Sequence, residues 1–263
     1  MKYEKNKSAV HAIKVLCSIA VFVCGLYLSF PAEAAGTYTE PGSTSLTQYG
    51  SNPVKCHTIS NADGSVTIMY SVWDGTSQTL HIDRFSSTGS RISSKSVAVP
   101  GETWGGTVYR GPDGCNYIAT GNGPDAAFYI SKYSADWNFM GTASIGKEES
   151  YTREAFDAGN SDMTMVGDYL IVHAARGRLD YHQSNTTFVI NKNTMQPVYV
   201  TGIFGIDHVG HSLSQFIRSD GNQVFMIDHG DGDPRGILLQ EYPLNEMNGT
   251  FEGQNDRSLY LYD

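Results

Sequence analysis

The chain has little cysteine and a deficit of basic residues, and each shortage excludes a class of protein. Only four of the 263 residues are cysteine, which excludes a small scaffold held together by many disulfides. Acidic residues outnumber basic residues by 27 to 18, for a formal charge of −9 at pH 7. An acidic chain repels phosphate backbones and anionic lipid surfaces, so nucleic acid is not an expected partner.

The motifs of several enzyme classes are also missing. The sequence has no phosphate-cradling glycine loop, no dinucleotide fingerprint and no nucleophile elbow. The stretch "GHSLS" (210–214) places a serine beside a histidine but lacks the second glycine of an elbow. After the N-terminal region, no long stretch has the apolar spacing of a helix. Composition therefore favours a β protein without identifying an activity.

The N-terminal region is typical of a secretory leader. Four lysines precede an apolar run at 15–30, and small residues follow with a cleavage pattern at Ala32–Ala34. We expect residues 1–34 to be removed after Ala34 and the mature chain to be extracellular or on the cell surface. The alternative is a retained membrane anchor, but the apolar run is shorter than the roughly 20 residues that a spanning helix needs. Membrane insertion of the mature chain is not expected.

Cleavage would leave a more acidic chain with two cysteines. Removing four of the 18 basic and two of the 27 acidic residues gives a formal charge of −11. Cys56 and Cys115 could form one disulfide or be two small buried hydrophobic residues, and both alternatives stay open. The remaining length suits one large β domain. We divide it into an N-terminal segment, 35–51, and a domain, 52–263.

A repeat of about 50 residues organises this domain. Four turn glycines, Gly64, Gly114, Gly167 and Gly221, stand 50, 53 and 54 residues apart. Each precedes a β-rich run, at 66–72, 116–120, 169–174 and 223–228. A further strand is expected at 79–85, 127–133, 186–192 and 236–242, and a closing strand at 90–99, 137–145 and 196–202, with a poorer one after Tyr242.

Four antiparallel strands per repeat predict an all-β fold, a β-propeller of about four four-stranded blades. A β-sandwich with accidental spacing is the alternative. The final residues "NDRSLYLYD" read as the start of another unit, so the ring could be incomplete or truncated and be completed by another chain. The blade pattern, with the stretches "HQSNTTF" (182–188) and "DHGDGDPRG" (228–236), resembles secreted bacterial β-propeller repeat proteins over about residues 52–247. Such families are functionally diverse, so the resemblance implies architecture alone.

Antiparallel strands sort the connections onto two rims. The turns between first and second strands and between third and fourth strands form what we call the turn rim. Its aspartates have local roles in turns. The loops between second and third strands, with the connections between repeats, form the loop rim. It comprises 72–78, 101–106, 120–126, 153–161, 173–185, 205–212 and 228–236. Five of the eight histidines lie on the loop rim, so we expect the functional site there.

The loop rim supplies the candidate site residues. Side chains suited to proton transfer and to neutralising a carboxylate are the candidate catalytic group: His173, Arg176, Tyr181, His182, His211, His229 and Arg235. The candidate ligand-binding group is Trp73, Trp104, His208 and Asp231, where the tryptophans could stack on sugar rings. Each has a structural alternative: a buried histidine, a solvated arginine or a tryptophan in the core.

Metal binding has only incomplete motifs. Asp231 and Asp233 could be oxygen ligands for Ca²⁺, but the terminal glutamate of a helix-flanked calcium loop is missing. His208, His211 and His229 could bind Zn²⁺ and leave room for a reactive water. No cofactor is certain.

Three functions compete. The first is a secreted binding module that recognises an extracellular glycan or protein through the loop rim. The second is a polysaccharide-degrading enzyme, a lyase or hydrolase, that uses the histidine, arginine and tyrosine residues of the same rim. The third is an inactive remnant. The sequence favours the first and does not identify the ligand.

Overall fold

The computed structural model describes residues 56–157, 159–201, 215–230, 236–245 and 250–251. All of them belong to one compact unit of the chain. The described residues form strands, turns and bends but no helix, and so none of them forms a helix that could span a membrane.

The strands form four antiparallel sheets that follow one another along the chain. Sheet 1 contains β1 (Cys56–Ser60), β2 (Val66–Trp73), β3 (Gln78–Phe85) and β4 (Arg91–Val99). Sheet 2 contains β5 (Thr103–Arg110), β6 (Asn116–Gly121), β7 (Phe128–Tyr133) and β8 (Phe139–Ile145). Sheet 3 contains β10 (Ser161–Val166), β11 (Tyr169–Arg178), β12 (Gln183–Asn191) and β13 (Gln196–Val200). Sheet 4 contains β14 (Phe216–Ser219), β15 (Gln223–Gly230), β16 (Gly236–Asn245) and β17 (Thr250–Phe251).

The repeat has a local cause in its turns. Gly64, Gly114, Gly167 and Gly221 all have positive φ, between 54° and 99°. Only glycine adopts this backbone region at no steric cost, and it lets each first strand reverse into the second. Within each set of four strands the strand order is the order along the chain. The prediction of an all-β fold with four four-stranded antiparallel repeats is confirmed.

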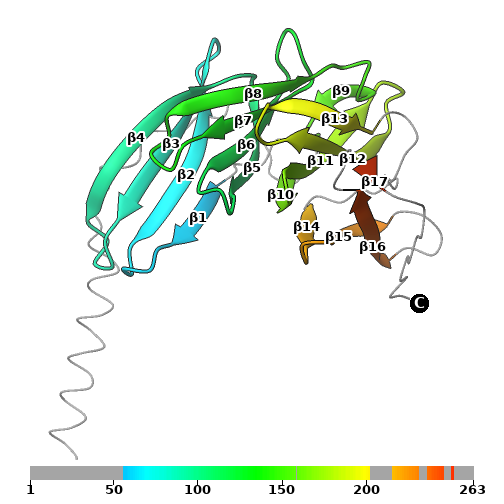
Figure 1. The fold of residues 1–263 in the computed structure, drawn as a ribbon. Coiled ribbons are helices and arrows are strands. Elements are labelled where there is room, and N and C mark those ends of the chain that lie inside the picture. The colour runs from blue at the N-terminus through cyan, green and yellow to red at the C-terminus, as the bar shows by residue number, and fades with distance from the viewer. Residues whose placement is uncertain (1–55, 158, 202–214, 231–235, 246–249, 252–263) are drawn as a thin grey trace, which may run out of the picture. The chain divides into compact units, whose positions relative to one another are not determined.

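Successive sheets pack face to face, and each contact has its own hydrophobic core. Sheets 1 and 2 enclose a cluster that includes Met69, Leu80 and Ile118. Sheets 2 and 3 share a larger cluster, and sheets 3 and 4 share another. The first strands β1, β5, β10 and β14 lie beside one another in that order. Sheets that pack in series around adjacent first strands have the arrangement of β-propeller blades (Figure 1).

The sheets differ in how many of their faces are covered. In sheet 2, every residue of β6 and β7 is buried, and β11 and β12 of sheet 3 are buried almost throughout. In β2 of sheet 1 only Met69 is buried, and on sheet 4 Phe216 and Ile227 are exposed. The two middle sheets are therefore packed on both faces and the two end sheets on one.

Sheet 3 departs from the predicted repeat because it has a fifth strand. The short strand β9 (Thr152–Ala155) pairs with the end of β11, with a register shift between Gly177 and Arg178. Such irregularities redirect side chains and occur often beside functional sites. This strand lies in the connection between sheets 2 and 3, which belongs to the loop rim.

Candidate functional site

The loop rim is described only in part. The predicted site residues His208, His211, Asp231 and Arg235 lie outside the described residues. His229 belongs to β15, but its side chain is not described. The predicted zinc site and calcium site fall there as well, and both stay predictions. The described residues contain no cluster of three His, Cys, Asp or Glu side chains that could hold a metal ion.

His173 links sheet 3 to sheet 4 from a buried position. Only 1% of the residue is exposed, and its ring nitrogens lie 3.0 Å from Thr187 Oγ1 and 2.9 Å from Asp228 Oδ2. In the described part of the chain, Asp228 Oδ1 and both amide atoms of Asn185 have no hydrogen-bond partner. His173 thus joins two β sheets at a site that solvent does not reach.

Arg176 is likewise buried, on the opposite face of β11. Its Nε donates to Ser184 Oγ at 2.9 Å, and its Nη1 donates to the carbonyl oxygens of Ser150 and Thr201. These acceptors satisfy the guanidinium within the protein, as a buried charge requires. The arrangement ties three segments of sheet 3 and its connections together.

The other described candidates divide between core and surface. Trp104 packs in the core between sheets 1 and 2, whereas Trp73 is half-buried at the end of β2. Tyr181 and His182 lie next to each other in the loop between β11 and β12, and both are exposed. The structure therefore does not bring His173 and Arg176 to the same surface as Tyr181 and His182.

A group of polar side chains that we did not select from the sequence is linked to Tyr181 through Arg153. Arg153 Nη2 lies 3.9 Å from both Glu154 Oε2 and Asp157 Oδ2. The Arg153 guanidinium lies 4.8 Å from the centre of the Tyr181 ring, and Gln183 Nε2 donates to Asp157 Oδ2 at 3.5 Å. We call Arg153, Glu154, Asp157, Tyr181 and Gln183 the β9 rim cluster.

Sheet 2 holds the backbone of the β9 rim cluster in place. Asn122 Oδ1 accepts a hydrogen bond from the Ala155 amide at 2.7 Å, and its Nδ2 donates to the Ala155 carbonyl at 3.3 Å. One side chain thus supplies both hydrogen bonds that a neighbouring strand would otherwise provide. It fixes the end of β9 against sheet 2.

The chain around the cluster is locally strained. Tyr151, Phe156 and Tyr181 have φ values of 48°, 58° and 68°, a region that bulky residues seldom occupy. Gly177 permits a close approach, because a Cβ atom there would lie 2.8 Å from Asp157 Oδ2. Strained backbone persists only where the surrounding structure enforces it, and it gathers at binding and catalytic sites.

The two carboxyl groups of the cluster differ in environment. Burial, and next the negative charge of Asp157, raise the pKa of Glu154 above its ordinary value. Asp157 is the less exposed of the two and accepts the hydrogen bond from Gln183. Their oxygens share one Arg153 nitrogen, so they lie no farther apart than twice 3.9 Å. The pair therefore combines a carboxyl group that holds its proton more tightly with a second, hydrogen-bonded one.

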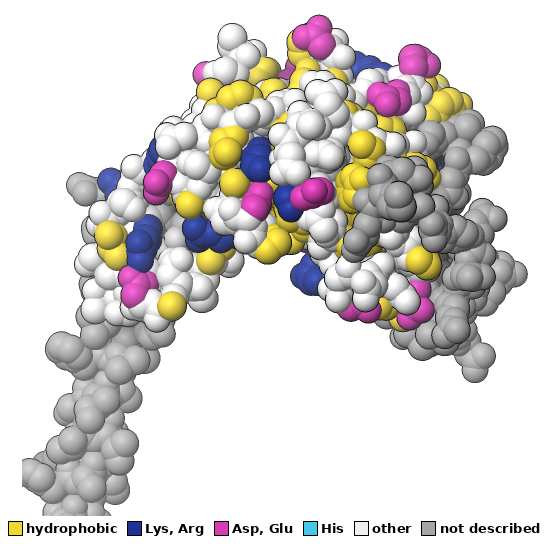
Figure 2. Space-filling model, in the orientation of Figure 1, with side chains coloured by type: hydrophobic (Ala, Val, Ile, Leu, Met, Phe, Trp, Pro, Cys, Tyr) yellow, Lys and Arg dark blue, Asp and Glu magenta, His cyan; other side chains and the backbone are white. Residues whose placement is uncertain are grey.

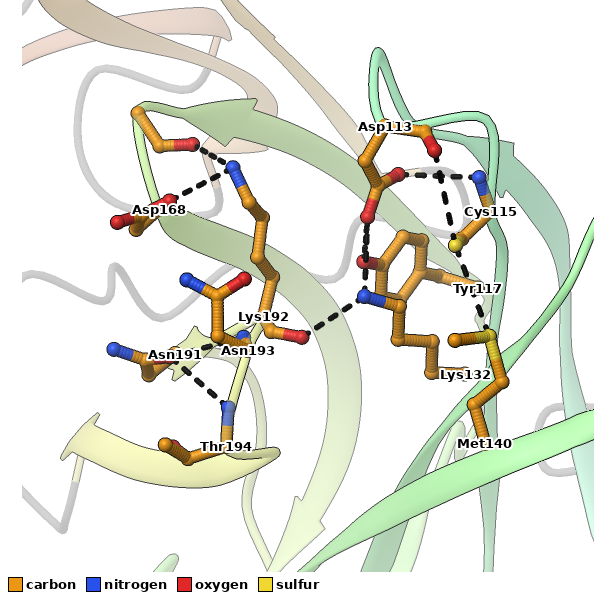
Figure 3. A network of polar contacts seen from close by, with 11 residues as sticks. Asp113, Cys115, Tyr117, Lys132, Met140, Asp168, Asn191, Lys192, Asn193 and Thr194 are labelled. Carbon is orange, nitrogen blue, oxygen red and sulfur yellow. Dashed lines mark hydrogen bonds and ion pairs between the residues drawn. The ribbon is translucent and has the colours of Figure 1, made fainter.

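The turn rim carries a second polar network that joins sheets 2 and 3 (Figure 3). The buried Lys132 donates to the Lys192 carbonyl at 3.0 Å and pairs with Asp113 Oδ2 at 3.1 Å. The Tyr117 hydroxyl donates to the same carboxylate at 2.7 Å, and burial, followed by this bond, raises the pKa of Tyr117. Lys192 in turn pairs with Asp168 at 3.0 Å. These contacts satisfy one another, so the network has a structural role.

The two cysteines of the domain are free thiols. Cys56 is exposed on β1, and Cys115 is partly buried before β6, where its Sγ lies 3.9 Å from Met140 Sδ. Burial, followed by the charge of Asp113, raises the pKa of Cys115, which keeps the thiol protonated and unreactive.

The comparisons with known proteins assign neither a family nor an activity to the chain. No family model and no curated protein matches the chain. Hydrazine synthase of Kuenenia stuttgartiensis is 17% identical with a TM-score of 0.46, and the match covers 84% of this chain and 53% of that one. A xylan β-1,4-xylosidase from Bacillus halodurans is 14% identical with a TM-score of 0.42, over 78% and 45%.

An α-L-arabinofuranosidase from Lactobacillus brevis is 12% identical with a TM-score of 0.40, and the match covers 79% of this chain and 77% of that one. The chain spans about half the length of the first two proteins. Similarity at this level assigns no activity to the chain. Its chemistry has to be derived from its own site residues.

Proposed function

We propose that the chain is a secreted β-propeller protein that binds an extracellular glycan at the β9 rim cluster. The observation that carries the proposal is Tyr181, which is 78% exposed beside the Arg153 guanidinium, and this guanidinium in turn lies next to two carboxyl groups. An exposed aromatic ring offers an apolar face to a sugar ring, and neighbouring polar groups give hydrogen bonds to hydroxyl groups. Export rests on the leader at 1–34 and is tested by N-terminal sequencing of the protein recovered outside the cell.

The charges of the surface favour a ligand that is not a polyanion. Over the described residues of the face in Figure 2, basic and acidic side chains are interspersed and form no stripe of one sign. In the β9 rim cluster, one arginine stands beside two carboxyl groups. We therefore place neutral oligosaccharides before uronate polymers as ligands.

The experiment is calorimetric titration of the protein with neutral and uronate oligosaccharides, with Tyr181→Ala as the test variant. We expect at least a tenfold weaker Kd for Tyr181→Ala, equivalent to about 1.4 kcal/mol. Phe139→Ala is the matched control, because Phe139 is an exposed aromatic residue at the start of β8, on the turn rim. Equal affinities for Tyr181→Ala and the unaltered protein would exclude this site.

A second function, glycan hydrolysis, is favoured by one observation, the unequal pair Glu154 and Asp157. Glycosidases use a carboxylic acid that donates a proton together with a second carboxylate, the two separated by about 5 to 9.5 Å. Release of new reducing ends that stops in Glu154→Gln and Asp157→Asn would support hydrolysis. Binding of oligosaccharides without such release would leave the binding function and reject the enzyme.

A further inference from the structure

Each of the two end sheets has a face that is only partly buried in the described structure. On sheet 4, Phe216, Ile227 and Leu239 pair across β14, β15 and β16 and therefore share one face. Phe216 is 51% exposed and Ile227 is 43% exposed. The next row, Ile217 and Met226, points to the other face and is buried against sheet 3.

Sheet 1 likewise has one buried face and one partly exposed face, and the partly exposed face is the one that points away from sheet 2. Met69 and Ile82 form a cross-strand row that is buried against sheet 2. The alternate residues Ile68 and Tyr70 point to the other face and are only half-buried. Asp83 pairs with Ile68, and its Oδ1 has no hydrogen-bond partner in the described part of the chain. This face thus combines partly exposed apolar groups with a buried carboxyl group, whose other oxygen accepts a hydrogen bond from Tyr70.

These two faces continue an interface that the chain already uses three times. We call the face of a sheet that points toward the next sheet along the chain its forward face, and the opposite face its backward face. In each core, the forward face of one sheet packs on the backward face of the next. Among the described residues, sheet 4 is the last sheet and its forward face is partly exposed, and sheet 1 is the first sheet and its backward face is partly exposed. Faces of matching kind at the two ends of a repeat favour head-to-tail association.

We propose that two copies of this chain associate head to tail, sheet 4 of each copy packing on sheet 1 of the other. The assembly has two-fold symmetry, and its two new interfaces bury Phe216 and Ile227 against Ile68 and Tyr70. It closes a ring of eight sheets, within the range of four to eight blades that is typical of propellers. The assembly is independent of glycan binding at the β9 rim cluster.

The test is the molar mass of the purified chain in sedimentation over a concentration series. We expect a dimer that dissociates in Ile227→Asp and in Ile68→Asp, with at least a tenfold weaker dimer Kd for each. Val198→Asp is the control, since Val198 is 39% exposed on β13 of sheet 3, which is neither of the two end sheets, and this variant stays dimeric. Phe216→Ser is a second sheet 4 variant should Ile227→Asp fold poorly, which its thermal unfolding curve would show.

Mixing the variants tests the head-to-tail geometry. An equimolar mixture of Ile227→Asp and Ile68→Asp regains one unaltered interface per pair, so heterodimers are expected where each variant alone is monomeric. A monomeric unaltered chain at all concentrations would overturn the proposal. So would dissociation by Ile227→Asp without any effect of Ile68→Asp, which would mean that sheet 4 packs on itself or that the chain covers sheet 1.

Discussion

The buried pair of His173 and Asp228 gives a quantitative test of how sheet 4 is held to sheet 3. Both side chains are 1% exposed, and the contact between His173 Nε2 and Asp228 Oδ2 is 2.9 Å. Asp228→Ala removes one partner of a buried hydrogen bond to the imidazole. Such a loss costs about 1–3 kcal/mol. For a domain of this size, this corresponds to a fall in Tm of roughly 2–12 °C.

The assay is thermal and urea unfolding followed by circular dichroism, with Asp125→Ala as control because Asp125 is an exposed loop residue. The control is expected to stay within about 0.5 kcal/mol of the unaltered protein. His173→Leu combined with Asp228→Leu should cost less than the sum of the single changes, because neither polar group then lacks its partner. A loss below about 1 kcal/mol for Asp228→Ala, or strict additivity in the double variant, would refute the reasoning.

Two further predictions concern the β9 rim cluster. Gly177→Ala should displace Asp157 and weaken glycan binding about tenfold in the calorimetric titration, a change of about 1.4 kcal/mol. Gly146→Ala is the control and should bind normally, because a Cβ atom at this position meets only ordinary van der Waals contacts. The raised pKa of Glu154 means that folding opposes the ionisation of its carboxyl group. The free energy of unfolding therefore falls as the pH rises above the ordinary pKa of 4.5. Glu154→Gln should therefore match the unaltered protein in thermal unfolding at pH 4 and exceed it at pH 7; equal Tm differences at both pH values would contradict the shift.

The repeated strands could be predicted because their causes are local. A glycine with positive φ stands at each first turn, and alternating apolar residues follow it. Antiparallel pairing then fixes which connections share a rim. The position of Tyr181 on an exposed loop follows from the same argument.

The fifth strand could not be predicted because its cause is not local. Residues 152–155, "TREA", have no β pattern and become a strand only because β11 extends to pair with them. Arg153 meets Tyr181 and Asp157 meets Gln183 through this pairing, so no spacing in the sequence indicates the cluster. The burial of Arg176 did have a signal, since it continues the alternating row of Leu170, Val172 and Ala174, which are all buried in one core.

The separation of the hydrophobic cores has a consequence for how the protein opens. Among the described residues, each core joins two adjacent sheets. Each sheet is therefore stabilised by its contacts with its neighbours, as in a linear repeat protein. Within one chain, sheets 1 and 4 can detach while sheets 2 and 3, which are packed on both faces, stay together. Backbone amides of β6, β7, β11 and β12 are therefore expected to exchange with solvent deuterium last, and the glycan site that we propose on sheet 3 belongs to the unit that persists longest.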